Sequence, residues 1–260
     1  MPSIAGTNVL VLGGTSGIGY AVAQAALREG AAAVHISSSN PTRVAAAVSR
    51  LKESSSSSTG AVIGHTCDLG TDDVEKRLEA LLDEATATGE KKKLDHIVFT
   101  AGDALAIKNV TDPTFDLAYI QKAGHIRFFV PLLLAKLAPR YLTPSHTSSL
   151  TLTGGTVARK PIPDWTVIAS YAAGLDGMVR GLALDLKPVR VNLVVPGAVR
   201  TEMWGDDAAR TDAMMAEIAR KMPLGKAGTP DEVAEAYVYF MRDSNATGSV
   251  VSSNSGNLLV

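Results

Sequence analysis

The chain has 260 residues, with 25 basic and 26 acidic side chains, a formal net charge of −1 and one cysteine. This balanced charge provides no basic stripe that would attract nucleic acid, and no apolar run is long enough to cross a bilayer. The N-terminus lacks the cationic and apolar regions of a secretory signal, and one cysteine forms no internal disulfide, so we expect a cytoplasmic protein. The five histidines are scattered without metal-ligand spacing, which predicts no metal site.

The first expected element is a phosphate-binding unit. Residues 7–13 read as a short buried strand that leads into a glycine-rich turn and then an alanine-rich helix over 20–30. Glycines permit a tight turn and a close approach of backbone N–H groups to a pyrophosphate, which the positive end of the helix also attracts. The residues expected to bind a dinucleotide in this unit are Gly13, Thr15, Ser16, Gly17, Ile18 and Gly19.

Apolar runs and helical patterns alternate along the rest of the chain. This alternation implies βαβ units, and we expect a single-domain α/β fold over 1–260, a Rossmann-type doubly wound parallel sheet with helices on both faces. Two polar stretches, Ser54–Ser58 and Gly89–Lys93, are expected to be surface loops. The further strands are expected at 33–36, 61–66, 94–100, 149–153, 189–195 and 248–252, and the helices at 42–52, 71–88, 115–137, 167–186, 207–222 and 230–242.

The end of the second expected strand indicates the choice of cofactor. An NAD enzyme normally carries an acid there to bind the ribose hydroxyls, whereas a 2′-phosphate needs hydroxyls and a cation. The stretch contains Ser37, Ser38, Ser39 and Arg43 and no acid, which favours NADP(H). Alternatively, Arg43 is only a solvated residue on the next helix.

These landmarks together resemble the classical short-chain dehydrogenase/reductase family over essentially the whole chain. The glycine turn matches the family's Gly-x3-Gly-x-Gly pattern. Three later segments, 67–69, 100–102 and 196–201, resemble family motifs and follow in the family's order. The resemblance implies further cofactor contacts at Asp68 and Leu69, at Thr100, Ala101 and Gly102, and at Pro196, Gly197, Val199 and Thr201.

The family's proton-transfer residues are absent. The family uses a Tyr as general acid, a Lys four residues later and a Ser thirteen residues earlier. Aligning the helix that follows without a gap places Ile168, Ala172 and Gly155 at these three positions, and Arg127 at the position of the assisting Asn. Tyr171 is expected to point away from the catalytic face, because a helix turns by about 100° per residue.

Three ionisable groups are candidates to replace the lost acid: Asp103, Arg127 and Asp164. They are expected to act directly on a substrate, or Arg127 forms a structural ion pair with Asp164 or with Asp103, because buried charges persist only when paired. Both can hold together, since a paired carboxylate can still face a cationic substrate. Trp165, Met203 and Trp204 are expected to line the substrate pocket, with a lid around 201–222. Met214 and Met215 lie on this lid or serve ordinary helix packing.

Three functions fit this pattern. The first is an NADPH-dependent reductase of a cationic C=N bond, since reduction of an iminium needs no proton, whereas a ketone gives an alkoxide that does. The second is a carbonyl oxidoreductase with a relocated acid, such as Asp164 with a pKa raised by burial. The third is a non-redox cyclase or binding module that retains the nucleotide as a structural element.

The chain also resembles an atypical subgroup of the family that includes fungal alkaloid reductases. That resemblance rests on the Arg at the Asn position and the absent Tyr and Lys. It implies reduction of an iminium-type intermediate and guidance of an intramolecular Diels–Alder cyclisation to bicyclo[2.2.2]diazaoctane alkaloids. The family resemblance further implies a homo-oligomer, a tetramer or a dimer.

Overall fold

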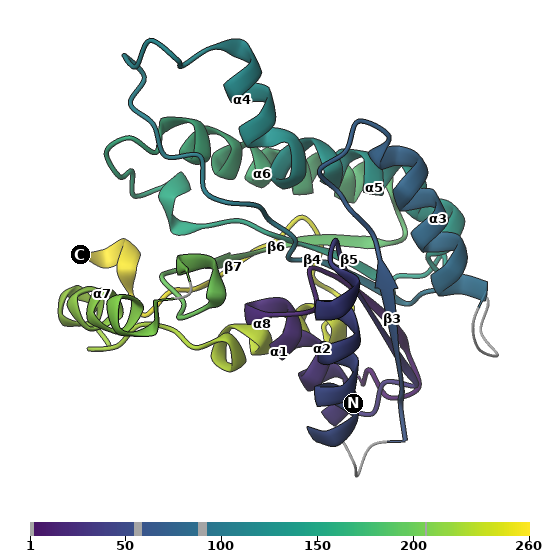
Figure 1. Ribbon diagram of the computed structural model, residues 1–260. Helices are drawn as coiled ribbons and strands as arrows, with labels where there is room; N and C mark the ends of the chain where they lie inside the picture. The colour runs from purple at the N-terminus through teal and green to yellow at the C-terminus, as the bar shows by residue number, and fades with distance from the viewer. Residues whose placement is uncertain (1–2, 55–58, 88–92, 206) are drawn as a thin grey trace.

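The computed structural model describes residues 3–54, 59–87, 93–205 and 207–260 (Figure 1). The predicted loop Ser54–Ser58 and the predicted loop Gly89–Lys93 lie, apart from Ser54 and Lys93, outside these residues. The first unit has the expected order of strand β1 (Asn8–Leu12), a glycine turn and helix α1 (Gly17–Arg28).

Seven parallel strands form one sheet in the order β3-β2-β1-β4-β5-β6-β7. The strand order reverses at β1, whose neighbours are β2 and β4. In open α/β sheets, ligands bind outside the carboxyl ends of the strands at such a reversal. The strands after β1 are β2 (Ala33–Ser38), β3 (Ala61–Thr66), β4 (His96–Phe99), β5 (Ser149–Thr153), β6 (Arg190–Pro196) and β7 (Val250–Ser253).

Helices cover both faces of the sheet, which confirms the predicted Rossmann α/β fold (Figure 1). One face carries α3 (Val74–Ala87), α5 (Val130–Tyr141) and α6 (Thr166–Asp185), and the other carries α1, α2 (Pro41–Ser54) and α8 (Pro230–Arg242). Helix α7 (Ala208–Lys221) lies at the edge of the molecule, beyond β7 in this view.

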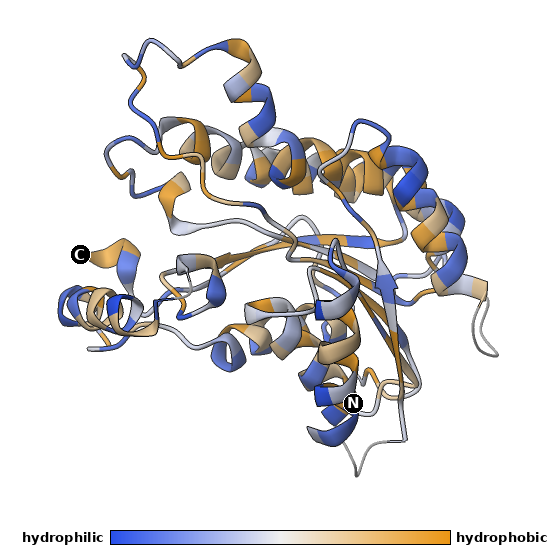
Figure 2. Ribbon diagram, in the orientation of Figure 1, coloured by the Kyte–Doolittle hydropathy of each residue, from blue (hydrophilic) through white to orange (hydrophobic). Residues whose placement is uncertain are grey.

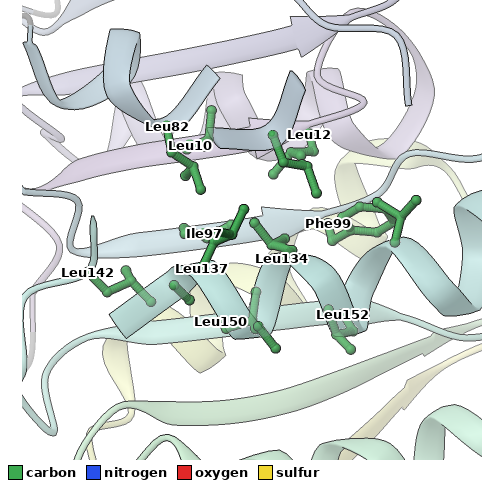
Figure 3. Packing of buried hydrophobic residues seen from close by; sticks show 14 of the residues in the cluster. Leu10, Leu12, Leu82, Ile97, Phe99, Leu134, Leu137, Leu142, Leu150 and Leu152 are labelled. Carbon is green, nitrogen blue, oxygen red and sulfur yellow. The ribbon is translucent and has the colours of Figure 1, made fainter. Parts of the chain in front are cut away.

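The strand sequences explain this three-layer arrangement. Alternate residues of each central strand face opposite helical layers, so these strands are buried on both faces and carry apolar side chains such as those of β1. Figure 2 shows hydrophobic stretches both in the sheet and on the helices that cover it. Figure 3 shows the core between the sheet and the layer of α3 and α5, where leucines of both helices pack on side chains of β1, β4 and β5. The second core contains Val9, Val11 and Ile36 below α1, α2 and α8.

The helix predicted over 115–137 is present, but it contains a turn of a different kind that the prediction did not include. The structure has α4 (Leu117–Gly124), then a π-helical turn η1 (His125–Phe129), and only then α5. Pro131 has no N–H and cannot donate to the carbonyl four residues earlier, and the Val130 N–H bonds to His125 O, five residues back. The wider turn changes the direction of the side chains on 125–129, including Arg127.

Helix α6 is the one helix among the described residues that is long and apolar enough to span a membrane by length and composition alone. Its inner face, with Val167, Leu175 and Val179, is buried. Helix α6 packs on β6 and on the short helix η2 (Thr156–Ala158), so it belongs to the helical layer of the α/β fold. Only 17% of its most apolar window is buried, so much of its outer face is open.

Candidate cofactor and substrate site

The glycine turn lies directly at the carboxyl end of β1. Gly13 has φ +86°, and a Cβ there would lie 2.6 Å from the backbone nitrogen of Ala101, at the end of β4. A Cβ on Gly19 would lie 2.3 Å from the carbonyl oxygen of Gly13 and 2.4 Å from Thr100 Oγ1. Only glycine fits at these two positions, so the turn presents its backbone at the strand ends, as a pyrophosphate requires.

Two further features of the turn suit an anionic cofactor. The Ser16 side chain makes no capping hydrogen bond at the start of α1, and the first N–H groups of that helix carry partial positive charge. The turn after β6 lies next to the glycine turn, because a Cβ built on Gly17 would lie 3.0 Å from Thr201 Cγ2. The residues of both turns that were predicted to bind the cofactor are thus neighbours. They include the buried Thr15 and Val199 and the half-buried Ile18 and Gly197.

The expected adenosine end lies beside β2. The Ser37 carbonyl accepts the N–H groups of both Gly13 and Gly14, at 3.0 and 3.2 Å, which fixes the glycine turn on β2. Ser38 is half-buried, and Ser39 and Arg43 are exposed. The Arg43 backbone N–H donates to Asn40 Oδ1, while no hydrogen bond or ion pair of its guanidinium occurs among the described residues. The Arg43 guanidinium is thus solvated in this structure and is available to a 2′-phosphate.

The remaining cofactor residues lie at the ends of β3, β4 and β6. Asp68 is exposed and its Oδ1 accepts the Gly70 N–H at 2.9 Å, while Leu69 is buried. The Thr100 hydroxyl donates to Leu12 O at 2.9 Å and ties β4 to β1. Ala101 is half-buried, Gly102 is exposed and Pro196 is buried at the end of β6. All the predicted segments therefore lie at the carboxyl edge of the sheet, where a dinucleotide fits.

The three positions of the missing proton-transfer groups lie after β5 and on α6. Gly155 follows β5, and Ile168 and Ala172 are half-buried on the first turns of α6. The Tyr171 hydroxyl donates to Ile120 O of α4 at 3.0 Å, and its ring lies 5.1 Å from that of Phe128. Burial raises the pKa of the Tyr171 phenol, which is the opposite of what a general acid needs.

Arg127 forms an ion pair with Asp103. Its Nε donates to Asp103 Oδ1 at 3.2 Å and its Nη2 donates to Asp103 O, while the guanidinium lies against Gly102. The side chains are 29% and 35% exposed. Burial lowers the pKa of Arg127 and the Asp103 carboxylate acts in the opposite direction, so the arginine stays cationic. Of the two pairings left open by the sequence, the structure has the one with Asp103.

Asp164 takes no part in this pair and contacts the loop at 108–109 instead. It is exposed, its Oδ1 accepts Asn109 Nδ2 at 2.8 Å, and its carbonyl accepts the Lys108 N–H at 2.9 Å. Its φ of +67° is unusual for a residue other than glycine. The burial that a relocated acid would need is therefore absent. Sequence reasoning missed Lys108 and Asn109, since nothing in a polar loop indicates a partner 55 residues away.

The expected substrate residues lie near the start of α6 and after β6. Trp165 is half-buried and precedes the first residue of α6. Met203 is 50% exposed, and the Trp204 indole N–H donates to Val199 O at 2.8 Å. Met203 and Trp204 are in the short helix η3 (Glu202–Trp204) before α7. Met215 is buried on the inner face of α7 and Met214 is half-buried, which favours ordinary packing for Met215.

Comparison with known proteins identifies the family. Residues 2–260 match the model of the SDR-like Rossmann domain. Short-chain dehydrogenase/reductase fsr5 of Gibberella fujikuroi is 42% identical over 98% of this chain and 96% of its own length. Short-chain dehydrogenase/reductase malC of Malbranchea aurantiaca is 42% identical over 98% and 95%. The chain therefore belongs to the short-chain dehydrogenase/reductase family of oxidoreductases.

Solved structures agree with this assignment. The structure of MalC reductase/Diels–Alderase from Malbranchea aurantiaca aligns with a TM-score of 0.89 and 40% identity, over 99% of this chain and 97% of the other. A small-chain dehydrogenase in complex with NADPH aligns with a TM-score of 0.75 and 28% identity, over 98% and 99%. Relatives of this chain thus include an NADPH-bound dehydrogenase and a reductase that is also named as a Diels–Alderase.

Proposed function

We propose that this protein is an NADPH-dependent reductase of a cationic C=N bond in a bulky, apolar, alkaloid-type substrate of fungal secondary metabolism. The observation that carries the proposal is the joint absence of the hydroxyl, phenol and amine at Gly155, Ile168 and Ala172. Loss of one such group can be compensated, whereas loss of all three removes the means to protonate an alkoxide. An iminium carbon needs no proton.

NADPH supplies a hydride when it is bound. The glycine turn and the start of α1 would hold its pyrophosphate, and the end of β2 would hold the ribose phosphate through Ser38, Ser39 and Arg43. The NADPH-bound relative supports this choice of cofactor. The residues 201–222, with η3 and α7, would serve as the substrate lid, with Trp165, Met203 and Trp204 as apolar walls.

The charges at the site suit a cationic substrate. Arg127 and Asp103 neutralise each other, so their pair has no net charge. Asp164 has no ion pair among the described residues and keeps its negative charge available for a bound iminium. A carboxylate attracts a nearby cation, and because Asp164 is exposed this attraction strengthens only when the substrate displaces the surrounding water.

A second role follows from holding such a substrate folded. Confinement of a flexible molecule lowers the entropic barrier to an intramolecular cyclisation, and no acid or base is required for a Diels–Alder step. The name of the MalC relative, a reductase and Diels–Alderase, supports a cyclisation after the reduction. A carbonyl oxidoreductase that uses Asp164 as the acid is less well supported, because Asp164 is exposed.

The outer face of α6 supports a homo-oligomer, a dimer or a tetramer. Leu184 is 74% exposed, and a Cβ on Gly177 or Gly181 would meet no atom within 4 Å. Small residues at spacings of four let two helices approach closely, and an exposed apolar face of this kind needs a partner. We propose that α6 packs against α6 of a second copy.

The function is tested with two compounds of similar size. The probes are 2-methyl-3,4-dihydroisoquinolinium, a stable cyclic iminium, and the ketone 1-tetralone. We expect the protein to oxidise NADPH in the presence of the iminium and to leave the ketone unchanged, as measured by loss of NADPH absorbance and by product analysis. Reduction of the ketone with no turnover of the iminium would contradict the proposal.

A further inference from the structure

Two loops that lie far apart in the sequence meet at Asp164. The segment after β4 contributes Lys108 and Asn109, and the segment after β5 contributes Asp164. The Lys108 backbone N–H donates to Asp164 O at 2.9 Å, and Asn109 Nδ2 donates to Asp164 Oδ1 at 2.8 Å. Consecutive residues of one loop therefore hold both the backbone and the side chain of the aspartate.

The orientation of the Asn109 amide is fixed from its other side. Its Oδ1 accepts the Thr111 N–H at 2.9 Å and the Thr111 hydroxyl at 2.7 Å. A flipped amide would direct its NH2 group at the Thr111 N–H and its oxygen at the Asp164 carboxylate, which would replace two of these hydrogen bonds by repulsion. The NH2 group of Asn109 thus faces Asp164 in one orientation.

The backbone of Asp164 is held in an uncommon conformation. Among the described residues, only Asp164 and Ser255 have a positive φ without being glycine. Such a conformation persists where surrounding contacts enforce it, and it is frequent at functional sites. The hydrogen bond from Lys108 supplies one such contact. The direction of the carboxylate is therefore set by the 108–111 loop together with the backbone of residue 164.

No cation of the neighbouring segments ion-pairs with this carboxylate among the described residues. The Lys108 ammonium donates to Thr114 and lies 4.1 Å from the centre of the Tyr119 ring, and the Lys160 ammonium donates to Asn257 and Val260. Asp112 accepts from Thr114, and Arg159 is exposed and forms no ion pair with Asp164 within the described part of the chain. The Asn109 side chain is neutral, so it binds Oδ1 of Asp164 without cancelling the charge of the carboxylate. Oδ2 of Asp164 is left for a ligand.

We propose that Asn109 is a positioning residue that orients the Asp164 carboxylate toward a bound cation. The inference rests on the proposed function, in which Asp164 faces the iminium. A lysine or arginine at position 109 would hold the carboxylate equally well but would neutralise it, whereas an amide fixes the direction and preserves the charge. Asn109 thereby determines the preference of the site for cationic over neutral substrates.

The experiment compares binding of two isosteric probes to the complex of the protein with NADP+, where no turnover occurs. The probes are 2-methyl-3,4-dihydroisoquinolinium and its neutral carbon analogue 3-methyl-1,2-dihydronaphthalene. The wild type should bind the cation more tightly. In Asn109→Ala this preference should fall by about tenfold, through the Kd of the cation alone, because a charged hydrogen bond is lost. Asn109→Gln, which keeps the amide, should recover most of the preference.

Two further variants make the result decisive. Asn245→Ala changes an exposed asparagine in the turn after α8 and should leave both Kd values unchanged. Thr111→Val removes the hydroxyl that donates to Asn109 Oδ1, and it should reduce the preference for the cation by less than Asn109→Ala does. This variant provides the test if Asn109→Ala does not fold. An unchanged preference in folded Asn109→Ala, or in Thr111→Val if it alone folds, overturns the inference. A wild type without preference for the cation instead contradicts the role of Asp164 in the proposed function.

Discussion

At the scale of single residues, the proposed site has an ion pair between Arg127 and Asp103 and a separate carboxylate, Asp164. Arg127 lies against Gly102 and binds both the side chain and the carbonyl of Asp103. Removal of one partner of a half-buried pair leaves the other charge unpaired, which is costly. The Arg127–Asp103 pair therefore fixes the segment after β4, while Asp164 remains available to a ligand.

The first prediction concerns Asp164 and Tyr171. Asp164→Asn keeps a side chain that tolerates positive φ but removes the charge, so the fold should be retained and the rate of hydride transfer to the iminium should fall at least tenfold. Tyr171→Phe removes only the bond to Ile120 O and should slow transfer by less than about threefold. Single-turnover kinetics measures both. A larger loss in Tyr171→Phe than in Asp164→Asn would refute this assignment.

The second prediction concerns Arg43 and the cofactor. Arg43→Ala should weaken NADPH binding by about 1.5 to 3 kcal/mol, toward the lower end because the residue is exposed, and should leave NADH binding nearly unchanged. Dissociation constants for the two cofactors provide the measurement. Lys52→Ala, near the other end of α2, is the matched control and should affect neither. Equal affinity of the wild type for NADPH and NADH would rule out the proposed phosphate site.

At the scale of secondary structure, the sequence predicted the helices from their apolar periodicity but did not show where the hydrogen bonding within a helix changes. The period across 115–137 is helical throughout, so it does not reveal the π-helical turn at His125–Phe129. Pro131 was a local signal for an irregular turn, because it removes one backbone donor. The direction of Arg127 depends on that turn, which explains why its partner could not be chosen from the sequence.

The third prediction concerns the open face of α6. A side chain at Gly181 has room in the single chain, since no atom lies within 4 Å of a Cβ built there. Gly181→Glu should therefore leave the fold intact, at a cost no greater than a surface substitution, but should prevent two α6 helices from packing. Sedimentation equilibrium should show a dimer or tetramer for the wild type and a smaller species for the variant. An unchanged assembly would show that α6 is not the interface.

At the scale of the whole molecule, the fold was predictable and the polar contacts of the site were not. The order of strands and helices follows from apolar runs such as Val9–Leu12, whose burial the parallel sheet requires. The contact between Asn109 and Asp164 joins two loops, and loop conformation depends on local backbone bonds rather than on a repeating pattern. The sequence therefore predicted a role for Asp164, which stays a prediction, whereas its contact with Asn109 appears only in the structure.

The fourth prediction concerns stability and pH. Burial lowers the pKa of His35 and of His96 from 6.5 to about 4, so both are neutral in the folded protein at pH 5. Below pH 6.5 the unfolded chain binds these protons first, so the free energy of unfolding should fall between pH 6.5 and about 4. The loss is about 3 kcal/mol at most for each histidine.

Urea unfolding at several pH values across this window measures the loss. The double variant His35→Asn/His96→Asn removes both titrating groups and should show a flatter pH profile than the wild type, whatever its stability at neutral pH. A wild-type free energy of unfolding that does not change across the window would mean that neither buried histidine resists protonation.

The central claim is that hydride reaches a cationic C=N carbon without a proton from the protein. The most direct test supplies NADPH carrying deuterium at the transferred position of C4 and presents 2-methyl-3,4-dihydroisoquinolinium and 1-tetralone together. Mass spectrometry and NMR then locate the label. We predict one deuterium at C1 of the tetrahydroisoquinoline product and none in tetralol. Deuterium in tetralol with none delivered to the iminium would contradict the account.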